Sequence, residues 1–263
     1  MQVGISQIIA RNLSLPDFLQ QAAASGYEVV ELCLQQEGAL TPQSTPTQLA
    51  QIVEAAAGQN LTLVSMTHNH CTGNLLDSGE AQQTSIDETK VGLQIAADLG
   101  IHCTLHTLGR LRPDLYYDDA YRNGIRSLQA IAETAEALDV ALAVEFVWNG
   151  FLFSPLEMKH FLDEVGSAQI GFYFDPGNMA VFQYPHHWVR IVGPHIKMVH
   201  LKDWQGRALN GGWPALLAGE IDYAAMNREL RAIGYDGPMI SEVPPEVASF
   251  AKTAAAIRQI IQM

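Results

Sequence analysis

The sequence predicts a single-domain α/β protein with the architecture of a closed (β/α)8 TIM barrel. Three observations lead to this fold class: eight short apolar runs of strand length, helical patterns between them, and a length of 263 residues that suits eight strand–helix units. A doubly wound open sheet is the competing α/β architecture, but its glycine-rich phosphate turn is missing after the first strand. No proline-rich linker or low-complexity tract divides the chain, so we expect residues 1–263 to form one domain.

The eight predicted strands are β-prone apolar segments, each followed by a helical stretch. In chain order they cover residues 2–6, 27–34, 61–66, 101–106, 140–146, 169–174, 196–202 and 237–242.

Three of the intervening helices have clear signals in the sequence. The first, over 15–26, begins after Ser14 as a plausible N-cap and ends at Gly26. Two more are predicted over 123–139 and 222–234. In the first of these two, the apolar residues have the three- and four-residue spacing of one buried helix face: Ile125, Leu128, Ala132, Ala135 and Leu138.

The composition bears on partners and compartment. The net charge is −13, with 15 Lys and Arg against 28 Asp and Glu, so we expect no nucleic-acid partner, because phosphate neutralisation requires a basic face. No apolar run approaches the ~20 residues that span a bilayer, and no basic leader precedes the first apolar stretch. The three cysteines Cys33, Cys71 and Cys103 form no CxxC pair, which favours reduced thiols. A cytoplasmic protein without a membrane partner is expected.

Ionisable side chains stand at or near the ends of the predicted strands. Because the carboxyl ends of barrel strands meet at one mouth, such residues converge there. Buried apolar strands have no structural need for so many charges. The residues are Glu31, His68, His70, His106, Glu145, Asp175, His200 and Glu242.

Four of these residues belong to consecutive strands, the fifth to the eighth: Glu145, Asp175, His200 and Glu242. Neighbouring strands are about 5 Å apart, so the four side chains can meet on one ion. Each residue alone is more often an ion-paired or hydrogen-bonded polar group, but their coincidence favours a metal. Three carboxylates and one imidazole suit Mn²⁺ best, with Mg²⁺, Co²⁺ or Zn²⁺ as alternatives.

The other candidates have equally good structural explanations. His68, His70 and Cys71 in the segment HNHC resemble a zinc cluster but lack a partner set, so a polar loop is the preferred interpretation. His106 could reach a substrate or serve as a hydrogen-bonded wall residue. His186 and His187 suit an exposed helix start, with the next residue, a tryptophan, packed inward.

Three arginines lie in loops that follow the fourth and seventh strands. They are Arg110, Arg112 and Arg207, and each could bind an anion or a hydroxyl group or simply be solvated.

At this point the segments AVEF, FYFDPGN, MVHLKD and LLAGEIDYAAMNRELRAIGYDG, followed by SEV, can be compared with known families. The chain resembles the xylose-isomerase-like barrels grouped as sugar phosphate isomerases and epimerases, over nearly its whole length. DPGN and HLKD most resemble the L-ribulose-5-phosphate 3-epimerase branch, and the order Glu, Asp, His, Glu also matches ketose 3-epimerases. The resemblance implies metal ligands at Glu145, Asp175, His200 and Glu242, with the two glutamates also acting as the acid/base pair.

Two positions depart from the ketose 3-epimerases that act on free sugars. Where these enzymes have a histidine three residues after the aspartate, this chain has Asn178. Where they have an acid six residues after the first glutamate, it has Phe151. Endonuclease-type barrels require further histidine and aspartate ligands, and the segment LKDWQGRALNGGW after His200 contains no histidine.

The expected activity is a metal-dependent isomerisation or epimerisation of a ketose or ketose phosphate through an enediolate. Glu145 and Glu242 are the expected acid and base, and six residues are candidates for contact with the sugar: His68, His106, Asn178, Lys202, Asp203 and Arg207. Alternatives are a metal-assisted lyase acting on a keto-sugar or glycoside, a non-catalytic sugar-binding barrel and an endonuclease-type phosphodiesterase. The sequence is compatible with a homo-oligomer.

Overall fold

The computed structural model describes residues 1–208 and 210–263, and its strands form a closed parallel barrel. Around the barrel the strands follow the order β1-β10-β7-β6-β5-β4-β3-β2, and the pairing of β1 with β10 closes it. The barrel strands are β1 (Val3–Ser6), β2 (Val29–Cys33), β3 (Thr62–Thr67), β4 (Cys103–His106), β5 (Ala141–Glu145), β6 (Ile170–Phe174), β7 (Ile196–Leu201) and β10 (Met239–Ser241). The predicted fold class is confirmed, and every predicted strand contains or overlaps an observed one.

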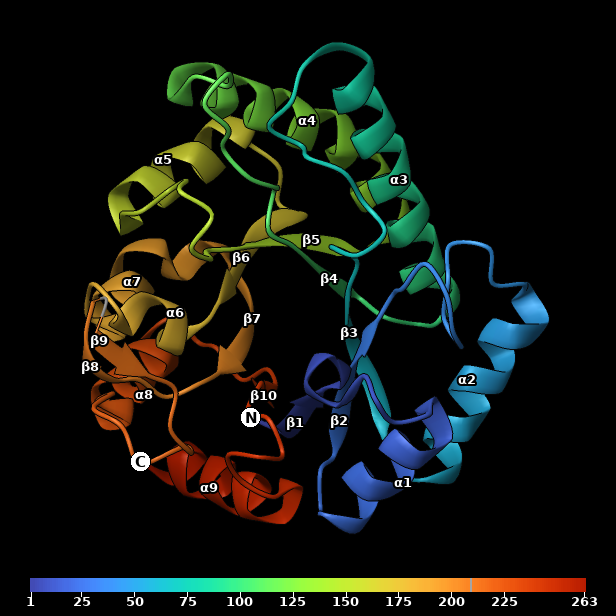
Figure 1. Cartoon of the computed structure of the whole chain (residues 1–263), viewed down its shortest axis with the longest axis vertical. Helices are drawn as coiled ribbons and strands as arrows, with labels where there is room; N and C mark the ends of the chain where they lie inside the picture. Colours follow the sequence, from blue (N-terminus) through green and yellow to red (C-terminus); the bar gives the residue numbers. More distant parts are fainter. Residues whose placement is uncertain (209) are drawn as a thin grey trace.

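Helices surround the barrel, as Figure 1 shows. They are α1 (Leu15–Ala24), α2 (Pro46–Gly58), α3 (Gly79–Asp98), α4 (Tyr117–Leu138), α5 (Pro155–Val165), α6 (Pro176–Ala180), α7 (Pro185–Val192), α8 (Tyr223–Ala232) and α9 (Phe250–Gln262), with 3-10 turns η1 (Gln7–Ala10) and η2 (Gly193–His195). The hydroxyl oxygen of Ser14 accepts a hydrogen bond from the backbone N–H of Asp17, so the predicted N-cap of α1 is confirmed. Within the described residues, no helix combines the length and apolarity that a membrane crossing requires.

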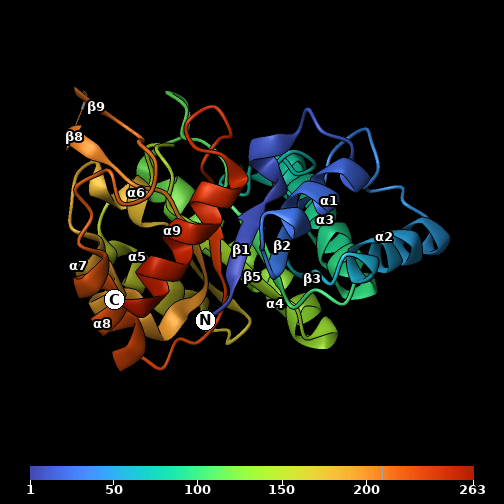
Figure 2. The ribbon, with the colours of Figure 1, turned by 90° about the horizontal axis from the view of Figure 1, so that it is seen from below.

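An antiparallel hairpin extends the loop between β7 and α8. Its strands are β8 (Gln205–Arg207) and β9 (Asn210–Gly212). Strand β1 runs away from the N-terminus, and the hairpin lies at the end towards which it runs (Figure 2). The hairpin therefore stands at the carboxyl end of the barrel, where the active sites of this architecture are found.

The apolar core has two layers because successive strand residues point to opposite faces. The larger layer lies between strands and helices and includes Leu142, Val144, Phe172 and Phe174. The smaller fills the barrel and consists of Cys103, Leu105, Ala141, Ala143, Tyr173, Met198 and Ile240. This alternation determines which side chains at the strand ends face the barrel axis.

Candidate metal centre at the carboxyl end of the barrel

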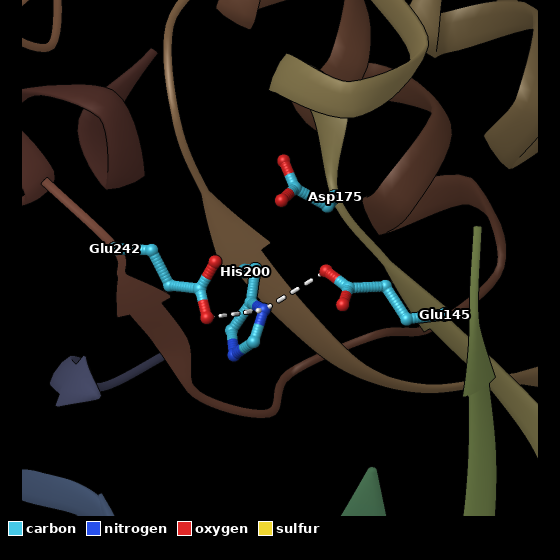
Figure 3. A group of neighbouring side chains, drawn as sticks. All are labelled: Glu145, Asp175, His200 and Glu242. Carbon is cyan, nitrogen blue, oxygen red and sulfur yellow. Dashed lines mark hydrogen bonds and ion pairs between the residues drawn. The ribbon is translucent and has the colours of Figure 1, made fainter. Parts of the chain in front are cut away.

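Four ionisable side chains occupy the inward-facing positions that follow the interior layer. On β5, Ala141 and Ala143 face the interior and Glu145 is the next residue in that series. Asp175 stands in the same relation to Tyr173, and His200 to Met198. Glu242, two residues after Ile240, completes the set at the end of β10. A two-residue period on four strands thus brings these side chains together, as Figure 3 shows.

The geometry of this quartet suits one cation. A potential ligand atom from each residue lies within 4.8 Å of those of the other three. His200 Nδ1 is 3.2 Å from Glu145 Oε1 and 3.5 Å from Glu242 Oε1. Opposite ligands of an ion bound at about 2.2 Å are about 4.4 Å apart, so small side-chain shifts would complete a coordination shell. Three carboxylates and one imidazole form a mostly hard donor set that fits a divalent ion.

The DPGN turn fixes the orientation of Asp175. Its Oδ1 accepts hydrogen bonds from the backbone N–H groups of Gly177 (2.8 Å) and Asn178 (3.3 Å), which makes Asp175 the N-cap of α6. Oδ2 is left for the quartet and for Lys202, whose Nζ is 2.8 Å away. The acid at the end of this buried strand therefore has two tasks, one for each oxygen.

Lys202 places a positive charge among the carboxylates. Its Nζ lies 2.8 Å from Asp175 Oδ2 and 2.6 Å from Glu242 Oε2. Burial alone would lower the pKa of Lys202, but these two carboxylates raise it well above its usual value. Lys202 is thus a permanent counter-charge to the quartet.

The pKa values of the two glutamates of the quartet are shifted in opposite directions. Burial raises the pKa of Glu145 to about 7, and the neighbouring charge of Glu242 acts in the same direction. Burial also disfavours the charged form of Glu242, but His200 and Lys202 outweigh it and lower the pKa of Glu242. In the metal-free protein Glu145 therefore holds a proton more readily than Glu242 does.

His200 is fully buried between carboxylates on both of its edges. Burial acts to lower its pKa, but the charges of Glu242 and Glu31 and hydrogen bonds to Glu145 and Glu31 raise it well above 6.5. Its Nε2 lies 3.0 Å from Glu31 Oε1, on the side of the ring opposite Nδ1. In the metal-free protein the ring is therefore a cation.

Glu31 lies inside the barrel, in the middle of β2 instead of at the strand end expected from the sequence. Burial acts to raise its pKa, but the His200 charge and hydrogen bonds lower it overall. A register shift between β2 and β3 at Val30/Glu31 aligns Ser65 with Glu31. The sequence shows an acid in a buried strand but not its partners, which come from β1, β3, β6 and β7.

Asn178 and Asp203 are both buried near the quartet but have different surroundings. The side-chain amide of Asn178 donates to Glu145 Oε1 (3.4 Å) and to the carbonyl of Phe146 (3.1 Å). The carboxylate of Asp203 accepts from the backbone N–H groups of Trp204, Gly219 and Ile221. Asp203 therefore anchors the loop before α8.

His68 and His106 lie away from the quartet. His68 is fully buried against α3, since a Cβ on Gly92 would lie 2.2 Å from His68 Nδ1. The two imidazoles pack edge to face, and Thr72 Oγ1 is 2.9 Å from His106 Nε2. Residue 106 continues the outward series on β4, so both rings lie in the layer between barrel and helices and not with the quartet. His106 also lines a groove of about 750 Å³.

The remaining candidates also lie outside the quartet. His70 approaches Arg11 (3.3 Å) while His68 faces α3, so the histidines of HNHC are not brought together. Arg112 pairs with Asp77 at 2.6 Å. Arg110 lines the groove of about 750 Å³ with Asn149, and Arg207 lines a cavity of about 580 Å³ with Trp204.

The residues around the predicted helix start and at position 151 differ in burial. Trp188 is buried and His187 is exposed, as expected for a helix start with its tryptophan packed inward. Phe151 is buried against Phe161.

Three tryptophans form a wall beside the quartet that sequence reasoning missed. Trp148 stacks on Trp213 with ring centres 4.5 Å apart, and Trp204 packs edge-on against both. The indole N–H of Trp148 donates to the carbonyl of Asn178 (3.1 Å), and the side chain of Asn178 contacts Glu145 of the quartet. The three residues follow different strands at no regular spacing, so the sequence carries no signal for the cluster.

Comparison with known proteins identifies the family of the chain. The profile of the xylose isomerase-like TIM barrel family matches residues 19–260. The chain belongs to this family. That result confirms the family expected from the sequence motifs.

Individual relatives are more distant. A putative L-ribulose-5-phosphate 3-epimerase, SgbU of Escherichia coli K12, is 26% identical over 271 residues, which cover 94% of this chain and 90% of that protein. A D-psicose 3-epimerase from Clostridium cellulolyticum H10, solved with D-tagatose, superposes with a TM-score of 0.85 at 16% identity, covering 99% of each chain. The IOLI protein, solved with a zinc atom, gives 0.83 at 15% identity, covering 100% of this chain and 98% of that one. At these identities the two structures establish the shared fold.

Proposed function

We propose that the protein is a divalent-metal-dependent isomerase or epimerase that acts on a ketose or ketose phosphate through an enediolate. The observation that carries the proposal is the convergence of Glu145, Asp175, His200 and Glu242 on a volume the size of one ion. In the metal-free protein the pKa of Glu145 is raised and that of Glu242 is lowered, which supports their assignment as acid and base. The SgbU relative and the tagatose-bound epimerase support a ketose substrate, and zinc in the IOLI protein supports a metal centre.

The four residues of the quartet would hold the cation, with Mn²⁺ as the proposed ion. Asp175 would bind through Oδ2, since Oδ1 already caps α6. His200 would bind through Nδ1, the ring nitrogen that faces Glu145 and Glu242. A bound divalent ion supplies Lewis-acid stabilisation of the negative charge that develops on the sugar oxygens, worth several kcal/mol of barrier.

The acid/base steps belong to the glutamates. Glu242, ionised, removes the proton from the carbon next to the ketone, and the electrons of that C–H bond form the enediolate. Glu145, which would hold the ion through one carboxyl oxygen and carry the proton on the other, then delivers that proton to the same carbon from the opposite face, which inverts the configuration. The reverse reaction exchanges the two roles. Removal of a proton from C1 instead, followed by delivery to C2, would give an aldose–ketose isomerisation.

Four of the predicted sugar contacts remain part of the proposal. Asn178 and Lys202 lie against the quartet, so they are positioned to contact hydroxyl groups of a bound ketose. Arg207 on the hairpin beside Trp204 is a candidate for the far end of the substrate, including a phosphate. His68 and Asp203 are not assigned sugar contacts, because His68 is buried against α3 and Asp203 is engaged by backbone N–H groups. His106 lines the groove of about 750 Å³ next to Trp148, so it remains a candidate contact.

The test combines two variants with a solvent-deuterium assay. Glu145→Gln and Glu242→Gln should each lower Mn²⁺-dependent epimerisation by at least ~10³-fold, because the two-base exchange requires both carboxyl groups. The substrate panel comprises ketoses, ketose phosphates, and 3-keto-glycosides. Glu145→Gln should still exchange the substrate C–H for deuterium without inversion, because Glu242 remains able to remove the proton.

The exposed Glu54 on α2 provides the matched control, and Glu54→Gln should retain full activity. Near-normal turnover by either quartet variant would contradict the two-base mechanism. Loss of a leaving group from a keto-glycoside, without deuterium-labelled epimer, would establish lyase chemistry in its place. A protein that binds the sugars and exchanges no proton would be a sugar-binding barrel.

A further inference from the structure

We propose that Glu31 is a positioning residue for the metal centre, and that it holds His200 in the tautomer that directs Nδ1 to the ion. The proposal rests on the metal-dependent function proposed above. It assigns a task to a buried charge that the acid/base chemistry leaves without one.

The two nitrogens of His200 face different environments. Nδ1 lies 3.2 Å from Glu145 Oε1 and 3.5 Å from Glu242 Oε1, within the quartet. Nε2 points into the barrel, 3.0 Å from Glu31 Oε1. A carboxylate on one nitrogen retains the proton there and leaves a lone pair on the other, which is how outer partners orient metal-bound histidines.

Glu31 is built to remain an ionised acceptor. Oε1 accepts from Ser6 Oγ (2.7 Å) as well as from His200, and Oε2 accepts from Ser65 Oγ (2.8 Å) and Tyr173 Oη (2.6 Å). These partners belong to β1, β3, β6 and β7, so the network crosses the barrel. A carboxylate that accepts four hydrogen bonds has no free site for a proton of its own.

The neighbouring aromatic ring restricts His200 as well. Tyr173 and His200 have ring centres 4.3 Å apart with an interplanar angle of 49°, so the imidazole packs against the phenol that also binds Glu31. The remaining interior layer is apolar, and includes Leu105, Ala143 and Ile240. A charge in such a layer is costly unless its interactions compensate for the lost hydration. Among the four proposed metal ligands, the Glu31 carboxylate is hydrogen-bonded to His200.

The experiment measures metal affinity in metal-stripped protein by titration calorimetry with Mn²⁺. Glu31→Gln keeps the size of the side chain, removes its charge and should weaken Mn²⁺ binding by ~10–100-fold. Tyr173→Phe removes one hydrogen bond but leaves Glu31 on His200, so a smaller loss is expected. Glu28→Gln is the matched control: Glu28 caps the backbone N–H of Val3 (2.8 Å) and should leave affinity unchanged even if stability falls.

A spectroscopic measurement on the wild-type protein does not depend on whether Glu31→Gln folds. In ¹⁵N-histidine-labelled, Zn²⁺-loaded protein, the His200 resonances, assigned by their loss in His200→Gln, should show a proton on Nε2 and the metal on Nδ1. Metal on Nε2, or a Glu31→Gln variant with wild-type Mn²⁺ affinity, would overturn the positioning role while the metal-dependent function stands. A wild-type protein that binds no divalent ion would overturn both.

Discussion

Glu145 and Glu242 show how neighbouring groups within one cluster give two chemically identical side chains different pKa values. Glu242 is close to both cations of the cluster, Lys202 and His200, which favour its charged form. For Glu145, burial outweighs the opposing hydrogen bond and charge of His200, the charge of Glu242 adds to it, and the pKa rises to about 7. His200 lies near both glutamates, so the difference is attributed to Lys202, whose Nζ lies 2.6 Å from Glu242 Oε2.

The protonation of the free quartet makes metal binding dependent on pH. A proton on His200 Nδ1 competes with the ion, a proton on Glu145 weakens the attraction of that carboxyl group for it, and both groups have raised pKa values in the metal-free protein. Mn²⁺ affinity should therefore increase from pH 5.5 to pH 8, and binding should release protons. Calorimetry in two buffers of different ionisation enthalpy measures both quantities. An affinity that is constant over this range would contradict the assigned ligands.

Lys202 should stabilise the metal-free protein more than the metal-loaded one. In Lys202→Met, Asp175 and Glu242 lose their counter-charge, and loss of one partner from a buried pair costs about 3 kcal/mol. Saturating Mn²⁺ should recover a large part of this loss, because the ion compensates the same carboxylates. Thermal unfolding with and without Mn²⁺ measures the effect. Equal destabilisation with and without Mn²⁺ would mean that Lys202 and the ion do not interact with the same carboxylates.

At the scale of elements, the short α6 is packed directly on the start of the β7–α8 loop. Gly177 permits this approach, since a Cβ there would lie 2.5 Å from Lys202 Cβ and 3.1 Å from its carbonyl carbon. The glycine of DPGN is thus explained by close packing against Lys202, and the aspartate by the cap and the quartet.

Gly177→Ala should accordingly disturb the metal centre. The added methyl group would displace α6 from Lys202 and shift Asp175, so we expect Mn²⁺ affinity to fall by about tenfold or more. Gly58→Ala is the control, because Gly58 lies in α2 with no atom near its virtual Cβ, and the exchange should be neutral or stabilise by up to ~1 kcal/mol. Calorimetric Mn²⁺ titration of both variants provides the comparison. Unchanged affinity in Gly177→Ala would show that the turn tolerates the displacement.

At the scale of the whole molecule, pairing of β1 with β10 joins the two ends of the chain into one closed sheet. We propose that residues 1–263 unfold as one domain. All four tryptophans, at 148, 188, 204 and 213, follow β5, so fluorescence reports the second half of the barrel while circular dichroism reports both halves. The two guanidinium chloride transitions should coincide. Separate midpoints would indicate two independently unfolding halves.

The fold and the quartet were predictable from sequence for the same physical reason. Strand alternation is a local property, and Glu145, Asp175, His200 and Glu242 each continue the inward series of their own strand. The partners of Glu31 depend on residues facing it across the barrel, such as Tyr173, and no local pattern encodes that contact.

His68 and His106 illustrate the opposite limit. Both stand at strand ends, but each lies one residue away from the inward-facing positions of its strand, so its side chain faces the helices. The absence of a side chain at Gly92 leaves space there for His68.

Anomalous diffraction at the manganese absorption edge, from crystals grown with Mn²⁺, tests the metal centre most directly. One strong peak should lie about 2.0–2.3 Å from Asp175 Oδ2, His200 Nδ1 and an oxygen each of Glu145 and Glu242. The absence of a peak at the quartet under saturating Mn²⁺, or a peak bound by other residues, would contradict the central claim.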